Sequence, residues 1–320
     1  MPQAFVFPGQ GSQSPGMGRD LVDAYPAARG VFQEVDDALG QDLSRLMFEG
    51  PEEQLVLTEN AQPALLTVSM AVVSVLEERF GTPLSEQANF FAGHSVGEYA
   101  ALTAAGAISL TDAVRLVQAR GRAIQEAVPV GVGAMAAILG LPYDDVWQIA
   151  RDAAGDDEVC QIANYNAPTE MVISGHRRAV NRAIESAKSQ GGKTVLLSVS
   201  APFHCALLEP AARELEALLD EVEIVEPAVP IVANVTATPL DNPDAIRRRL
   251  VEQMTEMVRW SESVEFLRDQ GVDLLVELGA GSILTQVAGR IDDSLTALAV
   301  SDPRELEEYL ARLAELQGSE

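Results

Sequence analysis

Ser95 stands at the centre of a G-x-S-x-G pattern that spans residues 93–97. Such a serine acts as a nucleophile when a strand leads into the pattern and a helix follows, because the glycines allow a tight turn that presents the hydroxyl at the helix N-terminus. The bare pentapeptide also arises by chance. Here residues 89–92 predict the strand and residues 98–102 the helix. This strand–turn–helix unit, which we call the elbow, favours a nucleophilic Ser95.

A serine hydroxyl needs a base, and the chain contains three histidines. His94 is the neighbour of Ser95, so the turn directs its side chain elsewhere, and His176 begins an arginine-rich predicted helix. We predict His204 as the base, because it lies where the chain can return to the elbow. A buried histidine with satisfied hydrogen bonds is the alternative. Cys205 competes poorly as a nucleophile, since no elbow and no separate base accompany it.

Arg120 is the third residue that could do chemistry. It belongs to a predicted helix that begins near residue 110 with the capping pattern Ser109-x-x-Asp112. At about 100° per residue, Arg120 lies about 80° from the centre of the apolar stripe, so it points half inward. A guanidinium in such a position needs a carboxylate partner. Helix geometry leaves open whether the protein or a ligand supplies that carboxylate.

The elements around these residues alternate between strands and helices. A strand over 4–7 leads into a glycine-rich loop over 9–13, and a helix is expected over 63–80 with Pro63 in its first turn. From residue 131 the order becomes βαββαβ, which is typical of a ferredoxin-like unit. Its expected strands are 134–139, 159–163, 171–174 and 194–199, and its expected helices are 143–154 and 177–190.

After this unit the α/β alternation resumes, with strands expected over 231–235, 272–278 and 295–299. We therefore predict an α/β fold with a mostly parallel sheet. The chain is expected to divide into a discontinuous core, residues 1–128 and 202–320, and an inserted ferredoxin-like subdomain, residues 129–201.

The charge balance excludes several classes of function. The chain of 320 residues has 22 Lys and Arg against 48 Asp and Glu, a net charge of −26, so we expect neither a nucleic-acid partner nor a membrane. Such acidity favours a salt-rich cytoplasm. Cys160 and Cys205 form no C-x-x-C pattern, so no disulfide scaffold and no metal site is expected. Without a signal peptide or a long apolar run, a cytoplasmic location is expected.

Several short motifs occur in one order along the chain and carry a resemblance to a known family. They are FPGQGSQ at 7–13, NAQP at 60–63, GHSVGE at 93–98, RG at 120–121, NYNAP at 164–168, APFH at 201–204, and Gln253 ahead of Trp260. Together they closely resemble the malonyl-CoA:acyl carrier protein transacylases over nearly the whole chain. The resemblance implies an α/β-hydrolase-like core with a ferredoxin-like insertion.

The resemblance also implies roles for individual residues. Ser95 is implied as the nucleophile and His204 as its base, with Arg120 binding the substrate carboxylate. The supporting positions that it implies are the backbone N–H groups of Gln10 and Val96 as an oxyanion hole, the backbone carbonyl of Gln253 behind His204, and the pocket residues Asn164, Gln62, His94 and Phe203. In related polyketide acyltransferases a Phe at this last position accompanies malonyl rather than methylmalonyl selection.

The activity implied by the resemblance is transfer of malonyl from malonyl-CoA to the phosphopantetheine thiol of acyl carrier protein, for fatty acid synthesis. No metal and no redox cofactor is expected, and we expect a monomer. The alternatives are a free-standing polyketide acyltransferase, a serine esterase or thioesterase, and a non-catalytic binding module. An esterase would have no use for an inward Arg120. The basic segments 247–249 and 177–182 and Arg290 are candidate carrier-docking patches, although each is also explained as a solvated helix face.

Overall fold

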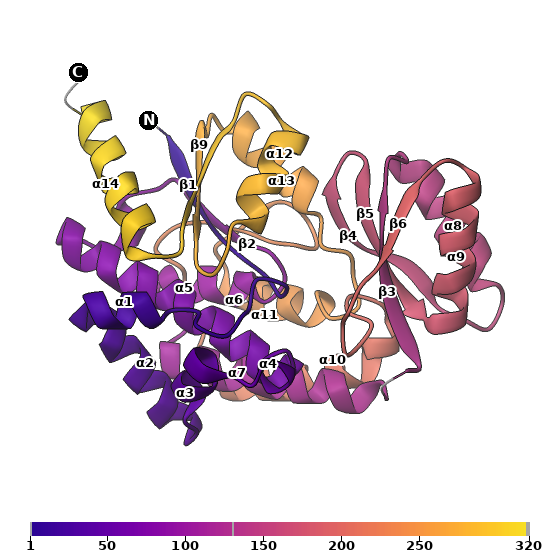
Figure 1. The fold of residues 1–320 in the computed structure, drawn as a ribbon, viewed down its shortest axis with the longest axis horizontal. Helices are drawn as coiled ribbons and strands as arrows, with labels where there is room; N and C mark the ends of the chain where they lie inside the picture. Colours follow the sequence, from indigo (N-terminus) through magenta and orange to yellow (C-terminus); the bar gives the residue numbers. More distant parts are fainter. Residues whose placement is uncertain (1, 130, 318–320) are drawn as a thin grey trace.

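Two β-sheets lie side by side in the computed structural model, which describes residues 2–129 and 131–317 (Figure 1). The larger sheet has the order β10-β9-β1-β2-β7-β8 and is parallel except for the β7–β8 pair. Its strands are β1 (Gln3–Phe7), β2 (Phe90–Gly93), β7 (Ile231–Val232), β8 (Pro239–Leu240), β9 (Leu274–Leu278) and β10 (Thr296–Val300). The predicted mostly parallel sheet is confirmed.

The smaller sheet is antiparallel, in the order β4-β5-β3-β6. It consists of β3 (Gly133–Leu139), β4 (Cys160–Ala167), β5 (Glu170–His176) and β6 (Lys193–Leu196), with α8 (Tyr143–Ala154) and α9 (Arg177–Ser189) between them. The chain order βαββαβ is the predicted one, and Figure 1 shows these elements together on the right. The division of the chain at residues 129 and 201 stays a prediction.

Helices cover both faces of the larger sheet, as buried parallel strands require. Successive side chains of β1 point to opposite faces: Phe5 and Phe7 join one apolar cluster, and Ala4 and Val6 another. The helices are α1 (Arg19–Ala24), α2 (Pro26–Leu39), α3 (Leu43–Glu49), α4 (Glu52–Leu55), α5 (Thr58–Phe80), α6 (Gly97–Ala104), α7 (Leu110–Ala127), α10 (Glu209–Glu221), α11 (Pro243–Glu252), α12 (Trp260–Asp269), α13 (Ile283–Ile291) and α14 (Pro303–Gln317), with short 3₁₀ turns at Leu84–Glu86 and Ala206–Leu208.

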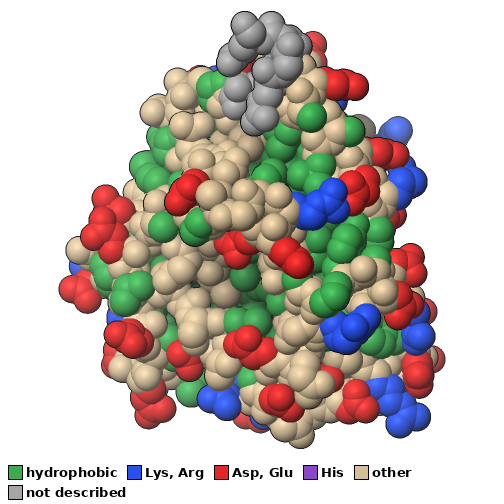
Figure 2. Space-filling view, turned by 90° about the vertical axis from the view of Figure 1, so that its left-hand side faces the viewer, with side chains coloured by type: hydrophobic (Ala, Val, Ile, Leu, Met, Phe, Trp, Pro, Cys, Tyr) green, Lys and Arg blue, Asp and Glu red, His purple; other side chains and the backbone are tan. Residues whose placement is uncertain are grey.

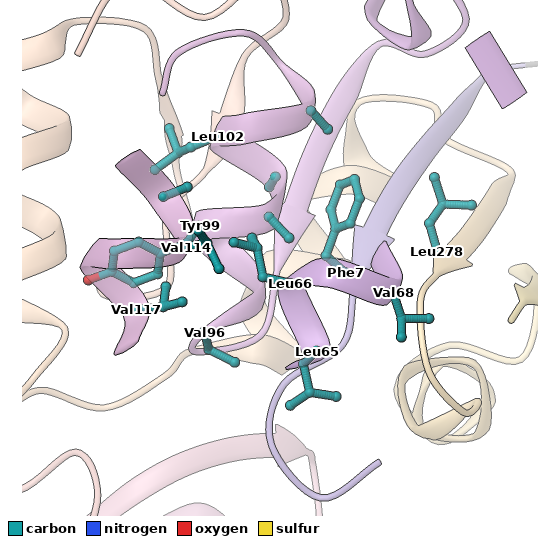
Figure 3. Close-up of a cluster of buried hydrophobic side chains, with 14 of the residues drawn as sticks. Phe7, Leu65, Leu66, Val68, Val96, Tyr99, Leu102, Val114, Val117 and Leu278 are labelled. Carbon is teal, nitrogen blue, oxygen red and sulfur yellow. The ribbon is translucent and has the colours of Figure 1, made fainter. Parts of the chain in front are cut away.

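The cluster below β1 and β2 joins the sheet to α5, α6 and α7. Figure 3 labels Phe7, Leu66 and Tyr99 among the side chains of this cluster, and all three are buried. Helix α5 is packed on nearly every side. Its buried side chains therefore surround much of the helix instead of forming one apolar stripe. Helix α6 of the elbow is thus packed between the sheet and helices α5 and α7.

Several predicted boundaries were wrong: β4 continues to Ala167 rather than ending at 163, β7 ends at Val232 rather than at 235, and two further differences concern the site. Helix α5 begins at Thr58 rather than at Pro63, because Asn60 and Ala61 already donate backbone hydrogen bonds to Leu57 O and the helix continues through the proline. Strand β6 ends at Leu196 rather than at 199. Leu197 N still donates to Met135 O over 2.9 Å, and residues 197–200 line a cavity. Both differences bring polar side chains of these segments to the site described below.

Among the residues that the structure describes, no helix is long and apolar enough to cross a bilayer. The same residues contain no cluster of three or more side chains arranged to bind a metal. Figure 2 shows acidic side chains spread over the left-hand face of Figure 1, with basic side chains between them.

Candidate active site

Ser95 lies in a tight turn between β2 and α6. Its backbone φ is 54°, a left-handed conformation that costs energy for a residue with a side chain. A Cβ at Gly93 would lie 2.0 Å from backbone atoms of Gly97, and a Cβ at Gly97 would lie 2.2 Å from Phe7 O. The two glycines of the pattern are therefore required by close backbone approach, which explains the G-x-S-x-G spacing.

A hydrogen-bonded chain of three groups starts at Ser95. Its Oγ lies 2.8 Å from His204 Nε2, and His204 Nδ1 lies 2.7 Å from the backbone carbonyl oxygen of Gln253. With Nδ1 donating to that carbonyl, Nε2 carries the lone pair that faces the hydroxyl. The carbonyl thus occupies the place that a carboxylate takes in a Ser-His-Asp triad.

Arg120 reaches the same serine from α7. Its side chain is 2% exposed; Nη1 donates to Gln62 Oε1 over 2.8 Å, Nη2 to Gln253 Oε1 over 3.1 Å, and Nη2 lies 3.5 Å from Ser95 Oγ. Its Nε is buried without a hydrogen-bond partner. Within the described part of the chain, no carboxylate forms an ion pair with Arg120. The direct contacts of this buried cation are therefore uncharged groups: two glutamine oxygens, the Ser95 hydroxyl, and the Tyr99 ring, whose centroid lies 5.6 Å from Arg120 Cζ.

Gln10 and Val96 come from two segments that line the cavity with Ser95. Gln10 belongs to the loop after β1 and Val96 is the N-cap residue of α6, and both line the same cavity as Ser95. Gln10 Nε2 approaches Thr58 Oγ1 at 3.4 Å, and Thr58 Oγ1 lies 2.9 Å from Ser200 Oγ. The glycine-rich loop is thus connected to the start of α5 and to the segment after β6.

The cavity at Ser95 has a volume of about 350 Å³ and brings the sequence-predicted site residues together. Its lining includes Asn164 of β4 and Phe203 beside His204, and the Phe203 backbone N contacts Met135 Sδ at 3.3 Å. His94 lines it too, but its Nε2 faces Asn166 Oδ1 at 3.0 Å rather than Ser95. Gln253 lies behind the cavity, where it is completely buried.

Burial determines which groups of the site can react. Burial and the nearby Arg120 cation lower the pKa of His204 to about 3, so its imidazole is neutral at neutral pH and can accept a proton. Burial also raises the pKa of the Cys205 thiol, which keeps this neighbouring sulfur protonated. Among the two side chains at 204 and 205, the imidazole is the reactive one.

Two residues behind the elbow were missed by the sequence reasoning. Asn234 Oδ1 accepts from the Ser95 backbone N over 2.7 Å, and its Nδ2 donates to Gly93 O over 2.6 Å. Glu98 Oε2 accepts from Asn234 N over 3.1 Å and from Gln253 Nε2 over 2.8 Å. Burial raises the pKa of Glu98 to about 7. The one signal for Glu98 was its place directly after the pattern, at the first turn of a predicted helix.

Comparison with known proteins identifies the family. A model described as "Acyl transferase domain" matches residues 4–302. The malonyl CoA-acyl carrier protein transacylase of Bacillus subtilis (strain 168) is 44% identical over 313 residues, covering 98% of this chain and 97% of the relative. The acyl-carrier-protein-S-malonyltransferase structure from Bartonella henselae is 48% identical, with a TM-score of 0.94 over 98% of this chain and 100% of that one.

A further solved structure contains a malonyl-transacylase bound to a carrier. It is a complex of a type II PKS acyl-carrier protein with its malonyl-transacylase, 42% identical, with a TM-score of 0.94 over 98% of this chain and 100% of that chain. The matched residues include every residue of the candidate site. This chain belongs to the acyl transferase family.

Proposed function

We propose that this protein transfers malonyl from malonyl-CoA to the phosphopantetheine thiol of an acyl carrier protein, through a malonyl-Ser95 ester. The observation that carries the proposal is the buried Arg120 guanidinium, which has no carboxylate partner and lies 3.5 Å from the serine hydroxyl. The relatives that span nearly the whole chain are named for this reaction, which supports it.

The first half-reaction forms the ester. His204 Nε2 removes the proton of Ser95 as Oγ attacks the thioester carbon, and the backbone N–H groups of Gln10 and Val96 stabilise the oxyanion. When the tetrahedral intermediate collapses, the carbon–sulfur bond breaks and CoA leaves as a thiol with the proton from His204. The Gln253 carbonyl holds the imidazole in the required tautomer throughout.

The second half-reaction repeats these steps with another thiol. His204 takes the proton of the carrier's phosphopantetheine thiol, the sulfur attacks the malonyl ester, and Ser95 leaves with the returned proton. Because the acyl group passes between oxygen and sulfur without a change in oxidation state, the reaction needs no redox cofactor, and His204 with the two backbone N–H groups provides the base and the oxyanion stabilisation without a metal. The ester must also resist water between the two steps, which distinguishes this activity from that of an esterase.

Arg120 gives the reaction its preference for a diacid. A malonyl carboxylate can form charge-assisted hydrogen bonds with the guanidinium, whereas an acetyl group leaves the buried cation unpaired. An esterase has no need of such a cation, so Arg120 favours the transferase. Phe203 and Met135 occupy one side of the cavity, where the ring restricts an α-methyl substituent.

The partners and the pathway belong to the same proposal. The carrier is an acyl carrier protein, and the product supplies fatty acid synthesis; a polyketide carrier is the second candidate, favoured by the solved relative that binds one. Among the residues of the candidate carrier-docking patches, Arg248 on α11 is exposed, whereas Arg290 forms an ion pair with Glu170. All groups of the proposed site come from one chain, so a monomer suffices.

The experiment is intact-protein mass spectrometry after brief exposure to malonyl-CoA or acetyl-CoA. The wild type is expected to gain one malonyl group, and Ser95→Ala to gain none. Arg120→Ala is expected to lose malonyl transfer by about 100-fold while acetyl transfer falls much less, since a contact to a buried charge is worth about 1.5–3 kcal/mol.

Two results would contradict the proposal. A malonyl group retained by Ser95→Ala would remove this serine from the mechanism. Equal losses of malonyl and acetyl transfer in Arg120→Ala would make the arginine structural. The same assay also tests carrier specificity. The malonyl-enzyme is mixed with a fatty acid carrier or a polyketide carrier, and loss of the malonyl mass shows which carrier accepts the group.

A further inference from the structure

Glu98 is a buried carboxyl group that the mechanism above does not use. Its residue is 2% exposed, in the first turn of α6, three positions after Ser95. The carboxyl oxygen Oε2 accepts from Gln253 Nε2 over 2.8 Å and from Asn234 N over 3.1 Å. A carboxyl group in this position costs desolvation energy, so its contacts must have a structural or a catalytic purpose.

Gln253 connects that carboxyl group to both functional side chains. Its backbone carbonyl accepts from His204 Nδ1 over 2.7 Å, and its side-chain Oε1 accepts from Arg120 Nη2 over 3.1 Å. Ser95 also contacts both side chains, but among the described residues Gln253 is the one outside the elbow that hydrogen-bonds both His204 and Arg120. The placement of Gln253 therefore affects the base and the carboxylate-binding cation together.

Glu98 offers the closest of three oxygen acceptors that face the Gln253 amide nitrogen. Nε2 lies 2.8 Å from Glu98 Oε2, 3.2 Å from Ser95 O and 3.3 Å from Asn234 Oδ1, and this leaves Oε1 toward the guanidinium. If the amide rotated by half a turn, its NH₂ group would face the N–H donors of Arg120. Its carbonyl oxygen Oε1 would then face the carboxyl oxygen of Glu98. The shortest of these contacts is the one with Glu98, and either protonation state of a carboxyl group offers an accepting oxygen.

We propose that Glu98 is a positioning residue, which fixes the Gln253 amide so that Oε1 holds the Arg120 guanidinium beside Ser95 for a substrate carboxylate. The inference rests on the proposed function, because it explains how that function obtains its preference for malonyl. Glu98 touches neither the substrate nor the reacting atoms, and it acts through Gln253.

The test is the ratio of malonyl to acetyl acylation rates of Ser95, measured by rapid quench and intact mass. Glu98→Gln keeps an accepting oxygen and should keep the ratio within about threefold of the wild type. Glu98→Leu removes the acceptor and should lower the ratio by about tenfold or more. Glu98→Asp keeps the charge but withdraws the oxygen by one methylene, and it should lower the ratio by at least about threefold.

Glu277 provides the matched control. It is also a fully buried carboxyl group, and it accepts from Leu284 N and Thr285 N at the start of α13. Glu277→Leu and Glu277→Gln should lower the melting temperature without changing the malonyl-to-acetyl ratio. Each ratio is measured on folded monodisperse protein, so loss of stability alone does not alter it.

The outcomes separate the two proposals. A wild type that forms no malonyl-Ser95 overturns the proposed function and this inference with it. A normal wild type with an unchanged ratio in Glu98→Leu overturns the inference alone. If Glu98→Leu does not fold, an unchanged ratio in Glu98→Asp has the same consequence, as does a ratio that falls equally in the Glu277 variants.

Discussion

His204 combines the position of a general base with an environment that opposes its protonation. The ring is buried, and both His204 Nε2 and Arg120 Nη2 approach Ser95 Oγ, at 2.8 Å and 3.5 Å. Both effects lower the pKa of His204, to about 3, while the hydrogen bond to Gln253 O acts in the opposite direction. The imidazole is therefore neutral well below pH 6.5, the usual value for histidine.

This electrostatic environment predicts the pH dependence of acylation. Because the base must be neutral, activity is present above the pKa of His204 and is lost as the pH falls through it. With that pKa near 3, acylation by acetyl-CoA should stay level from about pH 8 to about pH 5, where a histidine with an ordinary pKa would lose more than about tenfold. Rapid-quench acylation rates, with circular dichroism at each pH, provide the measurement.

Glu98 titrates in the same range, because burial raises its pKa to about 7. The profile is therefore recorded in parallel in Glu98→Gln, which lacks this titration. A step that disappears in the variant belongs to Glu98. A step near pH 6.5 that persists in the variant belongs to His204 and would show that its pKa is not depressed.

At the scale of elements, the crossing of α5 and α7 determines where Arg120 lies. A Cβ at Gly121 would lie 2.7 Å from the Glu59 N and Cα atoms and from Thr58 O, so only glycine allows the two helices to approach this closely. The same crossing places Gln62 Oε1 2.8 Å from Arg120 Nη1. The glycine after Arg120 thus contributes to the position of the cation.

Gly121→Ala is expected to separate the helices and to weaken malonyl binding. Overpacking of this kind costs about 1–3 kcal/mol of stability, and malonyl acylation should fall more than acetyl acylation because Arg120 moves. Gly30→Ala is the control: Gly30 is an exposed residue of α2 with no atom within 4 Å of the added Cβ. The free energy of unfolding of the Gly30→Ala variant should rise by about 0.5–1 kcal/mol. A Gly121→Ala protein with wild-type stability, measured by urea unfolding, contradicts this account.

Local patterns predicted the elements that carry Ser95 and Arg120, because the elbow and an amphipathic helix are encoded within a few residues. Position 98 could be placed on α6 but not in contact with position 253, since that contact depends on where α11 ends against the elbow. Pro63 predicted a helix start, yet α5 begins at Thr58. A proline six residues into a helix leaves one carbonyl unpaired, and burial of α5 among its neighbours compensates for that loss.

At the scale of the whole molecule, the charge of −26 opposes the compact state. The basic side chains are largely engaged: Arg182 pairs with Glu158, Arg249 with Glu252, and Arg268 with Asp269 and Asp292. Ion pairs at the surface each contribute little to the free energy of unfolding. They also leave a large excess of carboxylates. Figure 2 shows such carboxylates distributed over a whole face rather than gathered into one patch.

Salt is therefore expected to stabilise the folded protein by screening this repulsion. The Debye length falls from about 30 Å at 0.01 M to about 10 Å at 0.1 M ionic strength, so most of the gain should appear below about 0.3 M NaCl. Melting temperatures recorded from 0.01 to 1 M NaCl measure it. A rise that saturates in the lower range indicates screening, whereas a rise that is linear up to 1 M reflects exclusion of salt from the protein surface. A melting temperature that is unchanged across the series would mean that the carboxylates are too widely spaced to repel one another.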